Sequence, residues 1–242
     1  IDSDKIYDFH AKTGILPKTS AINVGEYIEY FKSLKEECAS IIFFSLSSGL
    51  SSTYNNAVIA ASEFEDVYVI DTKNLSSGGG LLVLAACDMV EQGLPAKEIA
   101  EKVQAMWDRV EASFVIDSLE YLYKGGRCSA LSVLGANLLK LKPCIEVKNG
   151  KMGVGKKYRG KYAEVLKEYI KERLDDLDSI EKNRVFLTHG GVDDEIVKEL
   201  IEIVRGYNYF DEVFATHASC TISSHCGRNT LGILFIRKSP IS

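Results

Sequence analysis

This sequence has no long apolar run, few prolines and no pattern typical of a secretory signal. Its longest unbroken apolar stretch is seven residues, Leu81 to Cys87, far short of the ~18 that a membrane span needs. We therefore expect no stable membrane insertion. The chain has only four prolines among 242 residues, against a usual share of about 5%, which favours a helix-rich fold. No basic segment followed by an apolar one opens the chain, so we expect no secretory signal.

Motifs for nucleotides and metals are also missing. Neither GxxxxGK[ST] nor GxGxxG occurs, so nothing in the motifs predicts nucleotide binding. The six cysteines form no CxxC pair and no metal-ligand pattern, and we expect neither a metal nor a cofactor. A chain of this length builds its core without disulfides, which favours reduced cysteines and a cytoplasmic location. The net charge of −5 argues against nucleic-acid binding.

The first 111 residues alternate between strand and helix patterns. A continuous β-rich run at 41–46 is typical of a strand that is buried on both faces, and a second strand is expected at 67–71. Helical spacing is present at 24–34, 53–64 and 81–92, and Asn23 with Glu26 forms an expected capping box. Strand, loop and helix in repetition predict a parallel sheet with helices on both faces. We expect Pro95 to begin a further helix whose one face carries Ile99, Val103, Met106, Trp107 and Val110.

The pattern changes near residue 112. Strands are expected at 114–116, 144–148, 151–154, 184–188, 212–216 and 231–236, and helices at 119–124, 130–141, 162–174 and 193–204. Asn149-Gly150 between two of these strands is a strong hairpin signal. A hairpin inside an α/β pattern implies a mixed sheet. The sequence therefore predicts an α/β protein with a parallel-sheet domain at 1–111 and a mixed-sheet domain at 112–242.

Three loops rich in hydroxyls and glycine are the candidate site. They are residues 18–20, 47–53 and 76–80, and each follows a predicted strand or precedes a predicted helix. Free N–H groups at a helix start and neutral hydroxyls suit a carboxylate or phosphate head group. Serine and threonine are also ordinary helix caps, which is the alternative for any one of these loops. His225 is the most site-like of the four histidines because small residues flank it on both sides.

One segment of the chain is strongly basic. Between Lys140 and Arg173 there are eleven Lys and Arg against four Asp and Glu, inside a chain of net charge −5. A solvated face is the default interpretation of such a segment. A docking surface for an acidic or phosphorylated partner is the functional one.

Taken together, these landmarks resemble the DegV family, whose members include the fatty-acid-binding subunits of bacterial fatty acid kinase. The similarity runs in the family's order over nearly the whole chain. Its most specific part is Leu119-Glu120-Tyr121-Leu122-Tyr123-Lys124-Gly125-Gly126-Arg127, close to the family's L-x-Y-L-x-K-G-G-R. The other matching segments are Pro17 to Ser20, Ser47 to Tyr54, Val69 to Lys73 with Ser77 to Gly80, Lys142-Pro143, and His225 to Gly227 with Thr230 to Gly232.

The resemblance implies a lipid-binding carrier with no catalytic residue of its own. It would hold one long-chain fatty acid between its two domains and present the carboxylate to a separate kinase subunit for phosphorylation. The residues implied for the head group are Thr19, Ser20, Ser48 or Ser51, and His225. The family begins with a strand some tens of residues before the Pro17 segment, so we expect the first domain to lack its first strands.

Within this reading, the basic segment is predicted to contribute to a docking face for an acidic surface of the kinase. The residues assigned to that face are Arg127, Lys156, Lys157, Arg159 and Lys161.

Two other functions compete with the carrier. A Ser48–His225 pair would suit hydrolysis of an ester or thioester. Against it, the chain has no G-x-S-x-G elbow and no acid clearly paired with the histidine. The same loops would also suit a module that binds a small phosphorylated metabolite.

Overall fold

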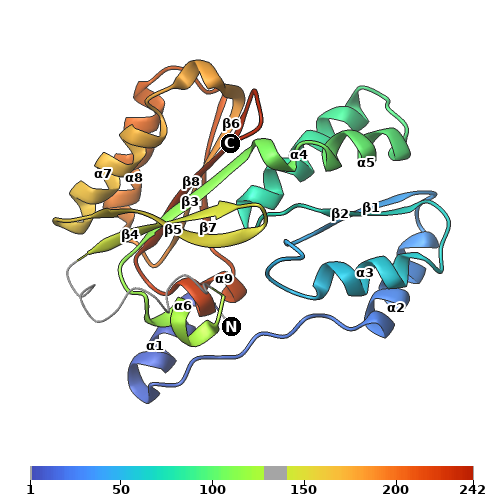
Figure 1. Ribbon diagram of the computed structural model, residues 1–242, viewed down its shortest axis with the longest axis horizontal. Helices are drawn as coiled ribbons and strands as arrows, with labels where there is room; N and C mark the ends of the chain where they lie inside the picture. Colours follow the sequence, from blue (N-terminus) through green and yellow to red (C-terminus); the bar gives the residue numbers. More distant parts are fainter. Residues whose placement is uncertain (1, 128–140, 242) are drawn as a thin grey trace. The chain divides into compact units, whose positions relative to one another are not determined.

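A computed structural model describes residues 2–127 and 141–241, and within this part it is a mixed α/β structure with two sheets (Figure 1). The chain divides into two compact units. Unit 1 consists of residues 1–19, 111–148 and 152–239, and unit 2 of residues 20–110, 149–151 and 240–242. The predicted helix at 130–141 falls almost entirely outside the described residues.

Unit 2 has a two-stranded parallel sheet with helices on both faces, as predicted (Figure 1). Helices α2 and α3 pack on one face through an apolar cluster that includes Tyr27, Phe31 and Ala57, and α5 packs against β2 from the other side. Its elements are α2 (Val24–Lys35), β1 (Ile41–Ser45), α3 (Thr53–Ala61), β2 (Val67–Asp71), α4 (Ser77–Glu91), α5 (Ala96–Gln104) and the 3-10 helix η1 (Trp107–Arg109).

Local signals explain how the first helix of unit 2 begins. The Asn23 side chain accepts from the Glu26 N–H at 2.9 Å, and the Glu26 carboxylate accepts from the Asn23 N–H at 3.1 Å. The predicted capping box is therefore confirmed. Pro95 instead lies one residue outside α5 as its N-cap.

Two other expectations for this region are wrong. Helix α5 ends at Gln104, so Met106, Trp107 and Val110 do not share its face, and Val110 begins the next strand. The stretch 77–80, expected to be a loop, is instead the first turn of α4.

Unit 1 contains a six-stranded mixed sheet in the order β5-β4-β3-β8-β6-β7. Strands β6 and β7 pair in parallel, whereas β6 pairs antiparallel with β8, and β3 antiparallel with β4. The elements are α1 (Ser3–Thr13), β3 (Val110–Ile116), α6 (Glu120–Gly125), β4 (Lys142–Lys148), β5 (Lys151–Tyr158), α7 (Tyr162–Arg173), the 3-10 helix η4 (Leu177–Ser179), β6 (Ile180–Gly190), α8 (Asp194–Gly206), β7 (Glu212–His217), α9 (Cys220–Cys226) and β8 (Thr230–Arg237).

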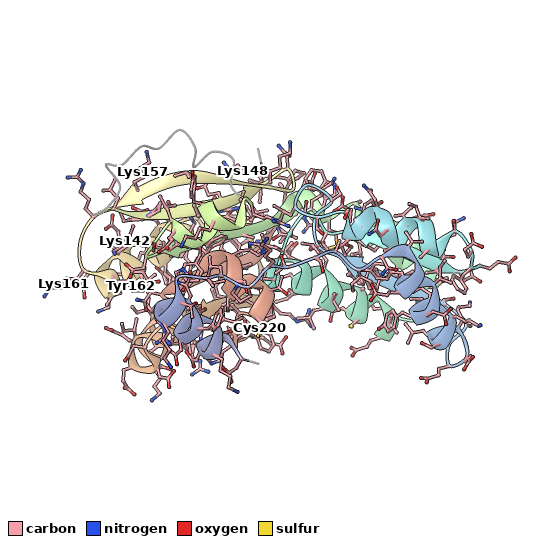
Figure 2. All side chains as sticks on the ribbon, turned by 90° about the horizontal axis from the view of Figure 1, so that it is seen from below. Lys142, Lys148, Lys157, Lys161, Tyr162 and Cys220 are labelled. Atoms are coloured by element: carbon pink, nitrogen blue, oxygen red, sulfur yellow. The ribbon has the colours of Figure 1, made fainter. Side chains whose placement is uncertain are left out.

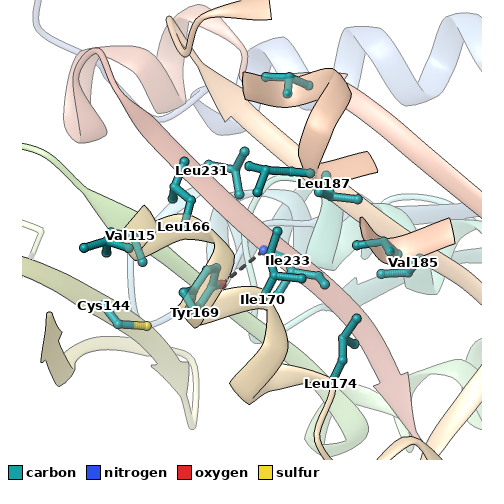
Figure 3. Packing of buried hydrophobic residues seen from close by; sticks show 14 of the residues in the cluster. Val115, Cys144, Leu166, Tyr169, Ile170, Leu174, Val185, Leu187, Leu231 and Ile233 are labelled. Atoms are coloured by element: carbon teal, nitrogen blue, oxygen red, sulfur yellow. Dashed lines mark hydrogen bonds between the residues drawn. The ribbon is translucent and has the colours of Figure 1, made fainter. Parts of the chain in front are cut away.

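The core of unit 1 lies between its sheet and helices α7 and α8. Figure 3 shows Tyr169 at its centre, among Leu166, Ile170 and Ile233. The Tyr169 hydroxyl donates to the Ser113 carbonyl at 2.7 Å and accepts from the Ile233 N–H at 3.1 Å. A fully buried phenol is tolerated here because its polar atom is hydrogen-bonded.

The hairpin between β4 and β5 turns where the sequence predicts it. Asn149 and Gly150 both have positive φ, at 50° and 75°, which is the requirement of a type I′ turn. Residues 149–151 of this turn belong to unit 2, where the Ser47 hydroxyl donates to the Gly150 carbonyl at 2.7 Å.

Helices α1 and α9 have no counterpart in the sequence prediction. Helix α1 has a clear N-cap, where the Asp2 side chain accepts from the Lys5 N–H, and ends at Gly14 with φ +70°. The sequence did not predict it because few apolar side chains recur at helical spacing, and only two of its residues are buried. It packs on α9 and belongs to unit 1, whereas the sequence assigns residues 1–19 to the first domain.

Candidate functional site

Thr19 and His225 are 206 positions apart in the chain and form a direct hydrogen bond. Their Oγ1 and Nε2 atoms are 2.8 Å apart. Thr19 lies in the extended segment after α1, and His225 lies in the last turn of α9. Both side chains are half-buried, so the pair is partly shielded from solvent and partly accessible to it. Ser20, the next residue along, is exposed.

The last turn of α6 packs closely against the imidazole of His225. A Cβ on Gly125 would lie 2.4 Å from His225 Nδ1, so only glycine permits this approach. Gly126 follows with φ +64° and ends the helix in the left-handed region. The two glycines of the K-G-G-R segment thus have different roles. Gly125 leaves space for the His225 imidazole, and Gly126 adopts the left-handed conformation that ends α6.

His225 is held in its neutral form. Burial lowers its pKa below the ordinary value, and the positive charge of Arg127 lowers it further. Nδ1 is buried and has no hydrogen-bond partner within residues 2–127 and 141–241. Because a buried donor without an acceptor is rarer than an unpaired acceptor, the arrangement favours the proton on Nε2. Nε2 then donates to Thr19 Oγ1, and the Thr19 hydroxyl proton is free to donate to a ligand.

A second polar cluster lies at the carboxyl ends of β1 and β2. Ser48 Oγ accepts from Lys73 Nζ at 2.9 Å, and Lys73 Nζ lies 2.8 Å from Asp71 Oδ2. The Ser48 N–H also donates to Asp71 Oδ1 at 3.1 Å. Burial alone would raise the pKa of Asp71, but hydrogen bonds from Lys73 and Ser48 outweigh it and lower the pKa. Asp71 is therefore ionised and neutralises Lys73.

Asp71 and Lys73 are not among the predicted site residues. The signal that points to them is the Asp-Thr-Lys sequence at the end of a buried strand, which the family comparison matched without a role. The Ser48 hydroxyl accepts from Lys73, and the Ser48 side chain also lowers the pKa of Asp71, so its proton is directed to that carboxylate. Ser48 is thus oriented by two charged neighbours.

Ser51 has a local task. Its hydroxyl is 2.8 Å from Thr53 Oγ1 and accepts from the Thr53 N–H at 3.2 Å, at the start of α3. The N-cap of α3 is Ser52, which makes no side-chain cap hydrogen bond, so the Ser51 contact is a local turn bond just before the helix. In the third loop, Gly78 is required because a Cβ there would lie 2.1 Å from the Asn74 amide oxygen.

The predicted docking residues divide into three groups. Lys157, Arg159 and Lys161 are exposed at the end of β5 and the start of α7. Lys156 instead pairs with Glu168 at 3.1 Å and with Glu172. Arg127 is exposed, donates to the Gly125 carbonyl at 2.8 Å and acts electrostatically on His225.

The hydrogen bonds do not favour the hydrolase alternative. The Ser48 side chain interacts with Lys73 and Asp71, and the partner of His225 Nε2 is Thr19. In the described part of the chain, no group of three or more His, Cys, Asp or Glu residues is arranged to hold a metal ion. No helix within these residues is long and apolar enough to cross a membrane.

Comparisons with known proteins agree on one family. The model of the family described as "Uncharacterised protein, DegV family" matches residues 1–238. A protein of Thermotoga maritima named fatty acid-binding protein is 31% identical over 240 residues, covering 96% of this chain and 82% of that protein.

Solved structures give the same answer. A DegV family protein from Thermus thermophilus, whose structure is described as showing fatty acid binding, has a TM-score of 0.89 at 25% identity, covering 98% of this chain and 85% of that one. A stearic acid-binding protein from Eubacterium ventriosum has a TM-score of 0.82 at 26% identity, covering 98% and 84%. By its sequence and by its fold, this chain belongs to the DegV family.

Proposed function

We propose that this chain binds one long-chain fatty acid and presents its carboxylate to a separate kinase. The observation that carries the proposal is the Thr19–His225 pair, a neutral hydroxyl and imidazole with a hydroxyl proton left free. Fatty acid binding by similar proteins supports the ligand class.

The chemistry of the head-group site matches a carrier. In this proposal the Thr19 hydroxyl donates to the carboxylate and the neutral His225 imidazole orients that hydroxyl, so this contact brings no full positive charge. Ser20, Ser48 and Ser51 are the further proposed contacts of the head group. The acyl chain supplies the affinity, because about 14 methylenes at ~0.8 kcal/mol each give roughly 11 kcal/mol of gross burial energy. A loosely held carboxylate can be handed over, whereas a bidentate arginine would retain it.

In this proposal both units contact the acyl chain, and the protein contributes no catalytic group. A photoreactive fatty acid cross-linked to the purified protein, with the labelled peptides identified by mass spectrometry, tests the first point. We expect labelled peptides from residues 20–110 and from residues 111–239. Labelling confined to one of these regions would contradict it.

The single most direct test is to identify what the protein carries. Mass spectrometry of lipid extracted from the purified protein should release a long-chain fatty acid. A phosphorylated metabolite would instead favour the small-molecule alternative, and an intact ester or thioester, the substrate class of the hydrolase, would favour that alternative.

The head-group role is tested by Thr19→Ala and His225→Ala. Each should lower phosphate transfer from the kinase more than it lowers fatty-acid binding, because one neutral hydrogen bond contributes only about 0.5–1.5 kcal/mol. Ser33→Ala, which removes an exposed hydroxyl bonded to the Tyr30 carbonyl on α2, is the matched control. Equal losses of binding and transfer would show that the head-group site dominates affinity.

We further propose that Arg127, Lys157, Arg159 and Lys161 contribute to the face that meets the kinase. Figure 2 shows Lys157 and Lys161 near the end of the β4–β5 hairpin and the start of α7. Lys156 contributes less, since its charge is shared with Glu168 and Glu172.

We also propose that this carrier works in the cytoplasm of a bacterial cell, together with the proposed kinase. A reducing location is consistent with Cys38, Cys87, Cys144 and Cys226, which form no disulfide in the described part of the chain.

A further inference from the structure

Strand β2 lies at the edge of its two-stranded sheet, and its main-chain groups alternate in direction. The Ile41 N–H donates to the Asp66 carbonyl at 2.9 Å, and the Thr72 N–H donates to the Ser45 carbonyl at 3.2 Å. The even-numbered residues from 66 to 72 therefore face β1. The odd-numbered residues 67, 69 and 71 direct their N–H and C=O groups to the outer edge.

A side chain already completes one of these outer positions. Gln104 on α5 accepts from the Asp71 N–H at 3.0 Å and donates to the Asp71 carbonyl at 3.0 Å. These are the two kinds of bond that a neighbouring strand would make. Within residues 2–127 and 141–241, no strand pairs with the outer edge at Val67 or Val69. The edge is thus open over two N–H and two C=O groups.

A groove follows this open edge. Its volume is about 630 Å³, and its walls are α3, β2 and α5. The α3 wall presents Tyr54 and Val58, the latter 40% exposed, and the α5 wall presents Ala100 and the exposed Glu101. An apolar floor beside unpaired main-chain groups is suited to an extended peptide, whose alternate side chains would enter the groove.

Charge determines what kind of peptide fits. Residues 20–110 contain 13 Asp and Glu against 6 Lys and Arg, a difference of −7. Glu101 lines the groove, and the Tyr68 hydroxyl in the same groove donates to Asp66 at 2.9 Å. Two copies meeting at this edge would bring two acidic units together, which is unfavourable. A segment that carries lysine or arginine is complementary instead.

We propose that the outer edge of β2 is a docking site for an extended, basic segment of another protein. The segment adds a third strand to the sheet through the main-chain groups of Val67 and Val69. Its apolar side chains contact Val58 and Ala100, and a basic side chain contacts Glu101. This edge lies within unit 2, and neither Val67 nor Val69 is among the residues assigned to the head group.

Main-chain pairing is tested with a peptide probe and the full chain. A fluorescein-labelled octapeptide of alternating lysine and valine is titrated by fluorescence anisotropy, beside two versions that are N-methylated on odd or on even residues. One methylated version should bind about tenfold more weakly and the other like the parent, since only one set of amides faces β2. Equal binding by both versions, or no binding by the parent, would overturn the proposal.

The location and the charge preference are tested on the protein. Glu101→Lys should weaken peptide binding about threefold, whereas Glu98→Lys, on the same helix and paired with Lys102, should change it little. Binding should also slow hydrogen exchange at the amides of Val67 and Val69. Unchanged exchange there would overturn the proposal. So would concentration-dependent dimers that the peptide does not dissociate, because the occupant would then be a second copy.

Discussion

At the scale of single residues, the chemistry of the candidate site depends on keeping His225 neutral. Burial and the nearby Arg127 both disfavour its protonation, and Gly125 holds the ring in a position that a larger residue would block. The histidine therefore acts as a hydrogen-bond partner of Thr19 and not as a cation for the carboxylate. Both predictions at this scale concern that arrangement.

The first concerns pH. His225 should titrate below about 6.5, the ordinary histidine value, and Arg127→Gln should raise its pKa by removing the positive charge. Because the folded pKa lies below the unfolded one, the contribution of neutral His225 to stability is complete above pH ~6.5. It is lost as the pH falls through the folded pKa. Imidazole titration by NMR measures the pKa, with Lys198→Gln as control. A pKa at or above 6.5 would contradict the neutral site.

The second concerns Gly125. Gly125→Ala should displace the imidazole and lower the free energy of unfolding by about 1–3 kcal/mol, since the new methyl group would overlap with His225 Nδ1. Gly80→Ala is the matched control, because a Cβ there meets no atom within 4 Å. Denaturant unfolding and the His225 NMR signals report the two effects. A stable variant with unchanged signals would show that the ring moves without cost.

At the scale of elements, buried charges connect the strands of unit 1 to α7. Arg173 on α7 bonds to Glu146 on β4 and lies 3.4 Å from Glu111 on β3, and Arg237 on β8 bonds to Glu111 as well. Each of these side chains is at least 79% buried. Burial would raise the pKa of Glu146, but Arg173 and Lys148 lower it below its ordinary value, so the network is charged.

Removing Arg173 leaves the largely buried Glu146 with only Lys148 as its partner, and Glu111 with only Arg237. Arg173→Met should lower the free energy of unfolding by about 3 kcal/mol. Arg205→Met, which breaks an exposed pair with Glu202 on α8, should cost under about 1 kcal/mol. Urea unfolding of both variants provides the comparison. Similar losses in the two would mean that the network contributes no more than a surface pair.

At the scale of the whole molecule, charge is divided unequally along the chain. Residues 20–110 carry a net −7 in a chain of net −5, and the excess of positive charge lies in the segment from Lys140 to Arg173. Such an asymmetry steers association with charged partners, and salt weakens it.

The kinase interaction should follow this asymmetry. Reversing Lys157 and Lys161 to glutamate should slow association with the kinase and reduce its salt dependence, with fatty-acid binding unchanged. In the control, Lys182 and Lys198 are changed to glutamate, which changes the net charge by the same amount. These two lysines lie outside the proposed docking face and pair with Asp211 and Glu195. Stopped-flow rates at low and high salt decide between them. If both double variants changed the association rate equally, the basic segment would be a solvated face and not a docking surface.

Sequence by itself determined the features that rest on local chemistry. The capping box at Asn23, the Asn149-Gly150 turn and the strands β1 and β2 are specified by neighbouring residues, and the family motifs follow from residue order. Helices α1 and α9 were missed for a physical reason, because α1 buries only two residues and α9 has only seven.

Only the tertiary structure decided which of these local pieces meet. The bond between Thr19 and His225, the Lys73 contact to Ser48 and the space that Gly125 leaves for an imidazole all join residues far apart in the chain. Gln104 against Asp71 is a further case. Such contacts depend on how elements pack, and no spacing along the sequence encodes the distance between two side chains that folding brings together.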